Sequence, residues 1–158
     1  MAQAPQAGDK APAFDMATDT GSVSLAGLKG RAVVLYFYPK DDTTGCTNEA
    51  NAFTAAQADF DEAGASVVGV SKDSAASHAK FRKKYGLTIE LGSDPEGAVV
   101  ESYGVWVQKS MYGRTYMGIE RATFLIDGDG IVRRVWHKVK VPGHAAEVLA
   151  EVQALAGG

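Results

Sequence analysis

The chain contains one cysteine, Cys46, and two residues shortly before it could help it to react. A thiol acts as a nucleophile only as the thiolate, so a reactive site must favour the anion without making the sulfur inaccessible. Thr43 offers a hydroxyl about one helical turn before the sulfur, and Pro39 fixes a backbone dihedral at the start of the intervening loop. Position alone leaves two interpretations of Cys46 open. It is either a reactive thiol or a small, inert core residue, which is the commoner fate of a cysteine.

A strand, a loop and a helix are predicted around Cys46, in that order. Residues 32–38 (AVVLYFY) are apolar without alternation, as expected for a parallel strand covered on both faces at the sheet centre. After the loop 39–45, apolar residues recur at near-helical spacing and predict a helix over about 46–63. Cys46 would open this helix, where free amides and the positive end of the helix dipole stabilise an anion and the charge that builds up on peroxide oxygens.

Strands and helices continue to alternate in the neighbouring segments. Residues 66–70 (SVVGV) predict a second inner strand, and Asp73 is a plausible N-cap for a helix that carries Phe81 and Tyr85 on one side. Nearer the N-terminus, residues 14–25 with a Thr-Gly turn predict a short β-hairpin.

A second hairpin and a final helix are predicted in the last third of the chain. Residues 122–126 and 131–136 flank an Asp-Gly-Asp-Gly turn, which favours antiparallel pairing and makes the sheet mixed. After Pro142-Gly143, an apolar stripe at helical spacing predicts an amphipathic terminal helix. The stripe consists of Ala145, Val148, Leu149, Val152 and Leu155. We therefore expect an α/β fold with a central mixed sheet and helices on both faces.

Composition and charge narrow the class of protein. With 158 residues, 46% of them hydrophobic and 22% charged, residues 1–158 are expected to form one globular domain with its own core. A formal net charge of −3 provides no broad basic field, so nucleic acid is not an expected partner. No secretory signal or membrane span is recognisable, and a soluble cytoplasmic protein without membrane partners is expected.

Metal sites are not expected. A single cysteine cannot build a multi-cysteine zinc site, and His78, His137 and His144 lack metal-ligand spacing, so surface or capping roles are expected for them. The Asp127-Gly-Asp-Gly turn begins like a calcium loop, but Ile131 occupies the next ligand position and a hairpin turn explains the segment better.

The segment around Cys46 resembles a known family. Residues 36–49 (YFYPKDDTTGCTNE) resemble the peroxiredoxin signature Pro-x-x-x-Thr-x-x-Cys, in the form typical of the bacterioferritin-comigratory-protein, or PrxQ, branch. The same branch is matched, in order, by residues 104–106 (GVW), 109–113 (KSMYG), 118–127 (GIERATFLID) and 136–144 (WHKVKVPGH). The resemblance implies a thioredoxin-like fold and the reduction of hydrogen peroxide or organic hydroperoxides without a metal, flavin or haem cofactor.

The resemblance also assigns roles to individual residues. Cys46 matches the peroxidatic cysteine, Thr43 the hydroxyl that contacts the sulfur and the peroxide, and Pro39 the residue that shields the pocket. Arg121 matches the site arginine, whose planar and permanently charged guanidinium suits both a thiolate and a pair of peroxide oxygens. Glu49 resembles the carboxylate that anchors this arginine. The helix dipole also favours a glutamate in a first helical turn, whatever its role in a site.

Thr44 and Gly45 lie between these residues and are expected to border the site. Many relatives carry proline where Thr44 stands, which changes the stiffness of the loop but leaves every proposed catalytic atom in place. We therefore expect activity to survive this departure.

A second departure concerns recycling of the oxidised cysteine. Relatives often carry a resolving cysteine five residues after the first, where this chain has Asn51, or on a following helix, near Arg82 or Val100 here. Because none is present, an external thiol such as thioredoxin, glutaredoxin or glutathione must attack the sulfenic acid formed at Cys46. The branch resemblance also favours a monomer.

Two other function classes remain alternatives. A monothiol, glutaredoxin-like transferase shares the fold, but such enzymes carry the thiol at the beginning of a four-residue motif, whereas Cys46 ends one. A non-catalytic binding module of the thioredoxin fold would keep an inert Cys46 and would show no burst of peroxide consumption.

Overall fold

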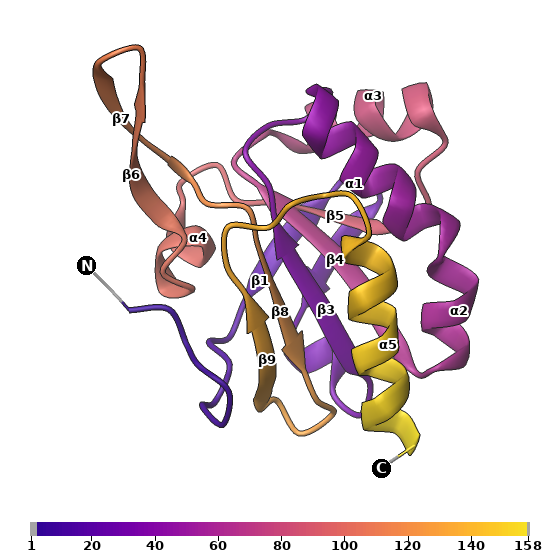
Figure 1. Ribbon diagram of the computed structural model, residues 1–158. Coiled ribbons are helices and arrows are strands. Elements are labelled where there is room, and N and C mark those ends of the chain that lie inside the picture. Colours follow the sequence, from indigo (N-terminus) through magenta and orange to yellow (C-terminus); the bar gives the residue numbers. More distant parts are fainter. Residues whose placement is uncertain (1–2, 158) are drawn as a thin grey trace.

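The computed structural model describes residues 3–157, which form nine strands and five α-helices (Figure 1). The strands are β1 (Asp15–Thr18), β2 (Gly21–Ser24), β3 (Ala32–Phe37), β4 (Ala65–Ser71), β5 (Glu90–Ser93), β6 (Trp106–Met111), β7 (Arg114–Ile119), β8 (Ala122–Ile126) and β9 (Val132–Trp136). The helices are α1 (Thr44–Ala55), α2 (Gln57–Glu62), α3 (Ala75–Tyr85), α4 (Ala98–Ser102) and α5 (His144–Gly157), with a 3-10 turn, η1, at Ala26–Leu28.

Seven of the strands form one mixed sheet with the order β2-β1-β5-β4-β3-β8-β9. β3, β4 and β5 run parallel, whereas β8 pairs antiparallel with β3 and with β9. β3 lies inside the sheet and is covered on both faces, because Val33, Leu35 and Phe37 join one core cluster while Val34 and Tyr36 join the other. The unbroken apolar run predicted this position, and both predicted hairpins are confirmed as β1–β2 and β8–β9.

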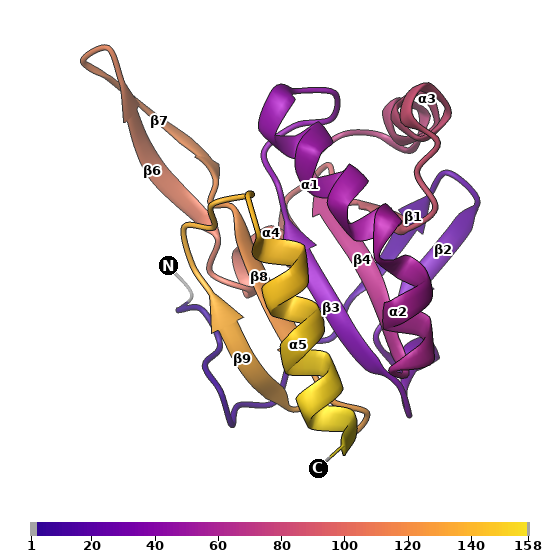
Figure 2. The same ribbon diagram turned by 45° about the vertical axis from the view of Figure 1, so that its right-hand side comes forward.

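Helices cover both faces of the sheet, but unequally. Figure 2 shows α1, α2 and α5 lying across one face, where Phe53, Phe60 and Val148 are buried in the core together with Phe81 of α3. The other face is covered by the short helix α4 and by the segment that leads into β1, through side chains such as Val100. The expectation of helices on both faces is thus confirmed.

Two details of the predicted helices are wrong. The expected single helix over 46–63 is two helices that separate at Ala56. Both helices pack on α5, and α2 packs on β4 as well. The N-cap of α3 is Ser74, whose hydroxyl accepts from the Ser77 amide, and not Asp73. Asp73 instead accepts from the Ser71 hydroxyl and from a loop amide described below.

Sequence analysis missed β5, α4 and the separate hairpin of β6 and β7. The first two are four and five residues long, too short to show a period. The β6–β7 hairpin projects from the body of the molecule (Figures 1 and 2), and most of its side chains are exposed on both faces, so no alternation marks it. Its tip carries Tyr112, which is 97% exposed.

Two buried tyrosines at the end of β3 differ in hydrogen bonding. The Tyr36 hydroxyl is buried without a hydrogen-bond partner among the described residues, whereas the Tyr38 hydroxyl donates to Asp41 Oδ1 at 2.5 Å.

We expect Tyr36→Phe to leave the free energy of unfolding unchanged or to raise it, because it removes an unsatisfied polar atom. Tyr38→Phe should lower it by about 1.5–3 kcal/mol, since it removes a hydrogen bond to a charged group. Urea denaturation of both variants checks this, and equal destabilisation would contradict it.

Candidate active site around Cys46

Cys46 lies in the first turn of α1, directly beyond the carboxyl end of β3. Thr43 is the N-cap in an extended conformation, and its carbonyl accepts the first helical hydrogen bond from the Thr47 amide at 2.8 Å. The amides of residues 44–46 therefore have no partner within the helix. They present a positive potential at the sulfur, as the strand–loop–helix pattern predicted.

The guanidinium of Arg121 reaches the sulfur from the neighbouring strand. Its Nη2 donates to Cys46 Sγ at 3.3 Å. The sheet register explains this approach, because Ala122 at the start of β8 pairs with Phe37 at the end of β3, and Arg121 immediately precedes Ala122. The antiparallel β3–β8 pairing thus places Arg121 beside the loop that leads from β3 to Cys46.

Glu49 anchors the same guanidinium from the next turn of α1. Arg121 Nη1 donates to Glu49 Oε1 at 2.8 Å, so one planar group bridges the carboxylate and the sulfur. Glu49 is 1% exposed, and its Oε2 atom is buried without a hydrogen-bond partner among the described residues. Burial raises the pKa of Glu49 to about 7, although the hydrogen bond to Arg121 and the charge of Arg121 lower it.

Gly45 borders the guanidinium closely. A Cβ atom at this position would lie 3.1 Å from Arg121 Nη2, which is tighter than ordinary van der Waals contact. Gly45 therefore leaves the space through which Arg121 approaches the sulfur, and this gives a physical reason for the glycine in the matched segment.

Three residues of the predicted site face outward. The Thr43 hydroxyl donates to the Lys40 carbonyl at 2.9 Å and makes no hydrogen bond to the sulfur in the described part of the chain. Pro39 and Thr44 are exposed on either side of it. The structure thus brings Arg121, Glu49 and Gly45 together at Cys46, whereas the contact expected between the Thr43 hydroxyl and the sulfur is absent.

Sequence analysis assigned no role to Lys109 of β6. Its side chain is partly buried, and burial together with the charge of Arg121 lowers its pKa. Because this strand lacks a hydrophobic period, only its place within the matched segments could have drawn attention to it.

The expectation of surface or capping roles holds for only one of the three histidines. His137 is exposed and pairs with Glu120 at 2.7 Å. His78 and His144 are buried instead: His78 lies 2.7 Å from Asp41, and His144 Nε2 lies 2.8 Å from the Thr123 hydroxyl. These two positions lie on the inward faces of their helices, which the apolar periodicity of those helices could have indicated.

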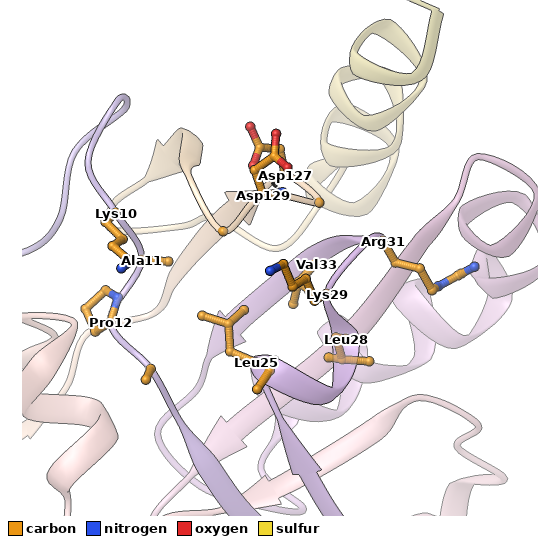
Figure 3. Close-up of a pocket in the computed structure, with 14 residues that line it drawn as sticks. Lys10, Ala11, Pro12, Leu25, Leu28, Lys29, Arg31, Val33, Asp127 and Asp129 are labelled. Carbon is orange, nitrogen blue, oxygen red and sulfur yellow. Dashed lines mark hydrogen bonds between the residues drawn. The ribbon is translucent and has the colours of Figure 1, made fainter.

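Other features of the described residues lie apart from Cys46. A hollow of about 560 Å³ between the 10–13 segment, η1 and the β8–β9 turn lies at the opposite end of β3 (Figure 3).

Within residues 3–157, no group of three or more His, Cys, Asp or Glu side chains is arranged to hold a metal ion. No helix in the same range combines the length and apolar character needed to cross a membrane.

Comparisons with known proteins identify relatives of this chain. Residues 7–135 match the AhpC/TSA family. A Coxiella burnetii protein provisionally named peroxiredoxin bcp is 51% identical over 148 residues, covering 93% of this chain and 98% of that protein. Peroxiredoxin Bcp of Bacillus subtilis is 47% identical over 143 residues, covering 90% and 91%.

A solved structure shows the same fold. It is that of the Xanthomonas campestris bacterioferritin comigratory protein, described by its alkyl peroxide reduction activity, and it matches with a TM-score of 0.86 and 43% identity. The match covers 90% of this chain and 92% of that chain. The family match, the identity over nearly the whole length and the shared thioredoxin fold lead to one conclusion: the chain belongs to the AhpC/TSA family, in the Bcp branch of the peroxiredoxins.

Proposed function

We propose that this chain reduces hydroperoxides with Cys46 as the nucleophile. The observation that carries this proposal is the Arg121 guanidinium, which donates to the sulfur at 3.3 Å and to Glu49 at 2.8 Å in the first turn of α1. A permanent charge and free helix amides on the same sulfur favour the thiolate, the form that attacks peroxide.

The reaction at this site consists of one displacement. The thiolate of Cys46 attacks the terminal oxygen of the hydroperoxide, an S–O bond forms, and the O–O bond breaks. The products are a sulfenic acid at Cys46 and, after one proton is taken up, water or an alcohol. Arg121 and the amides of residues 44–46 face the position at which charge develops on the departing oxygen, and their orientation is fixed before the reaction.

Thr43 and Pro39 complete the proposed site at its outer edge. The Thr43 hydroxyl donates a hydrogen bond to the Lys40 carbonyl. Its oxygen keeps lone pairs that can accept a hydrogen bond from a peroxide. Pro39, at the beginning of the loop, shields the site from solvent. Thr44 and Gly45 border the site, and Gly45 leaves room for Arg121.

The substrates are hydrogen peroxide and organic hydroperoxides. The alkyl peroxide reduction activity for which the Xanthomonas campestris relative is described supports the organic substrates. Cys46 is only 1% exposed, and a slim –OOH group suits so buried a sulfur. The position of Cys46 at the end of its four-residue motif, rather than at the beginning, counts against a glutaredoxin-like transferase.

Recycling depends on a thiol from outside the chain. Cys46 is the only cysteine, so thioredoxin, glutaredoxin or glutathione must attack the sulfenic acid and then reduce the mixed disulfide. Such reductants are maintained in the cytoplasm, where we propose that the chain works, as a monomer.

Removal of the Arg121 charge should slow the peroxide step. We expect Arg121→Ala to lower the second-order rate constant for Cys46 oxidation by roughly two or more orders of magnitude, the usual cost of removing one preorganised donor. Thr43→Val should also slow the reaction but leave the fold stable, since Thr43 is exposed. Stopped-flow kinetics measure both. Arg133→Ala, an exposed arginine paired with Asp127, is the control. Parent-like rates in the Arg121 and Thr43 variants would refute the site assignment.

The ionisation of Glu49 should appear in the pH dependence of stability. The pKa of Glu49 is raised from 4.5 to about 7 in the folded chain, so the folded state binds this proton more tightly than the unfolded state. The free energy of unfolding should therefore fall by up to about 3 kcal/mol as the pH rises from about 4.5 to 7. Urea denaturation at several pH values should show this fall in the parent and in the exposed control Glu96→Gln, but not in Glu49→Gln. Identical pH dependence in all three chains would contradict it.

Oxidised Cys46 should accumulate as sulfenic acid. After one equivalent of peroxide, intact-mass spectrometry should show a gain of one oxygen, and with glutathione present, one glutathionyl adduct. Excess peroxide without thiol should carry Cys46 on to sulfinic acid, because no internal disulfide competes with the second oxidation. Rapid, quantitative formation of a covalent dimer would show instead that a second chain resolves the intermediate.

A further inference from the structure

The loop between β3 and α1 is held by a buried ion pair that does not touch the sulfur. Asp41, in the middle of this loop, is buried, and its Oδ2 lies 2.7 Å from His78 Nδ1 on α3. The same oxygen accepts from the Ser77 hydroxyl at 2.8 Å, while Oδ1 accepts from the Tyr38 hydroxyl at 2.5 Å. Three side chains thus converge on one carboxylate next to the site.

The surroundings of His78 favour its protonated form. His78 is fully buried, and its Nε2 lies 3.0 Å from the Gly92 carbonyl, which can only accept a hydrogen bond. Its Nδ1 faces the Asp41 carboxylate, which also only accepts, so the ring donates to both partners only when each nitrogen carries a proton, as in the imidazolium. Burial by itself lowers the pKa of His78, but the hydrogen bond to Asp41 and the charge of Asp41 outweigh burial and raise it.

Two more groups from the α3 region hold the next residue of the loop. Asp42 has a φ of 59°, in the left-handed region that is unfavourable for most residues other than glycine. Its carboxylate accepts from Lys84 Nζ at 2.8 Å and from the Tyr85 hydroxyl at 2.6 Å. The Asp41 amide also donates to Asp73 Oδ2 at 2.8 Å. We call this set of contacts between the α3 region and residues 41–42 the α3 clasp.

We propose that His78 is a positioning residue for the reaction at Cys46: its buried ion pair with Asp41 holds the loop that sets Thr43 and the first turn of α1. This inference rests on the proposed peroxidase function. Asp41 lies two residues before the N-cap Thr43, so a shift of the loop moves the amides that face the sulfur. Misplacement of a site by about 1 Å can lower a rate by about a hundredfold.

The charges around His78 also determine how the clasp depends on pH. The titratable or charged groups near the imidazolium are Asp41 of the loop, Tyr38 at the end of β3, Asp73 before α3, and Asp19 of the β1–β2 turn, which pairs with Arg82 of α3. Because the folded-state pKa is raised, the stability that His78 contributes is complete below its ordinary pKa. It is lost as the pH rises through the raised value. Order in the loop should therefore decrease on the alkaline side.

Two variants of His78 separate the ion pair from simple packing. His78→Phe fills the site but removes both hydrogen bonds, whereas His78→Asn keeps one neutral donor for Asp41 and loses the charge. Lys83→Ala, an exposed position on the same helix, is the matched control. The measurements are the rate constant for Cys46 oxidation by hydrogen peroxide and the amide protection factors of residues 40–47, in which each exchange rate is corrected for the intrinsic rate at the same pH. Both are followed as a function of pH.

We expect His78→Phe to lower the rate constant about tenfold or more, with a smaller loss in His78→Asn and none in Lys83→Ala. The protection factors of residues 40–47 should fall in both His78 variants while β3 and β8 stay protected. A further fall in loop protection at alkaline pH should be seen only in the parent and in Lys83→Ala. Parent-like rates and loop protection in both His78 variants would overturn the proposal, as would acceleration of exchange spread evenly over the sheet. A parent chain that did not react with peroxide would refute the proposed function, whereas the exchange data would still report on the clasp.

Discussion

The contact between the Arg121 guanidinium and the buried sulfur of Cys46 is the interaction on which the rest of the site depends. An anion in such a place is costly unless charge and hydrogen-bond donors are already oriented toward it. Arg121 provides the charge and the first turn of α1 provides the amides. The sheet brings Arg121 and the first turn of α1 together, because the antiparallel β3–β8 register places Arg121 level with the loop that precedes α1.

The same arrangement destabilises the fold locally. Glu49 holds the guanidinium with one oxygen, while its other oxygen is buried without a hydrogen-bond partner among the described residues. Asp42 takes a left-handed backbone conformation in the adjoining loop. Such features persist only where surrounding contacts determine them: Arg121 holds Glu49, and Lys84 and Tyr85 of α3 hold Asp42. The loop before α1 is therefore held in part by α3, which carries no proposed catalytic atom.

Sequence reasoning succeeded where a pattern was long or specific. The unbroken apolar run of β3, the Asp-Gly turn of β8–β9 and the stripe of α5 each follow from side-chain period or turn chemistry. The matched segments singled out Cys46, Arg121 and Glu49, which the structure brings together. Sequence reasoning failed where tertiary packing decides the outcome. No residue type marks the separation of α1 from α2, and β5 is too short to show a period.

His78 shows the same limit at the level of a single side chain. Its place on the inward face of α3 follows from helical spacing, but its partner Asp41 lies 37 residues away in the sequence and becomes its neighbour only when the loop folds against α3. Long-range polar pairs of this kind leave no periodic signal. The Thr43 hydroxyl likewise makes no hydrogen bond to the sulfur, because it donates to the nearby Lys40 carbonyl instead.

The most direct test of the account is the reaction of the reduced chain with hydrogen peroxide in a stopped-flow instrument, beside free glutathione and the Cys46→Ser variant. The account predicts that the parent reacts about three or more orders of magnitude faster than the free thiol, the scale expected of preorganised charge stabilisation. The Cys46→Ser variant should not react. A parent rate equal to that of glutathione, or rapid attack on a glutathione mixed disulfide without reaction with peroxide, would contradict it.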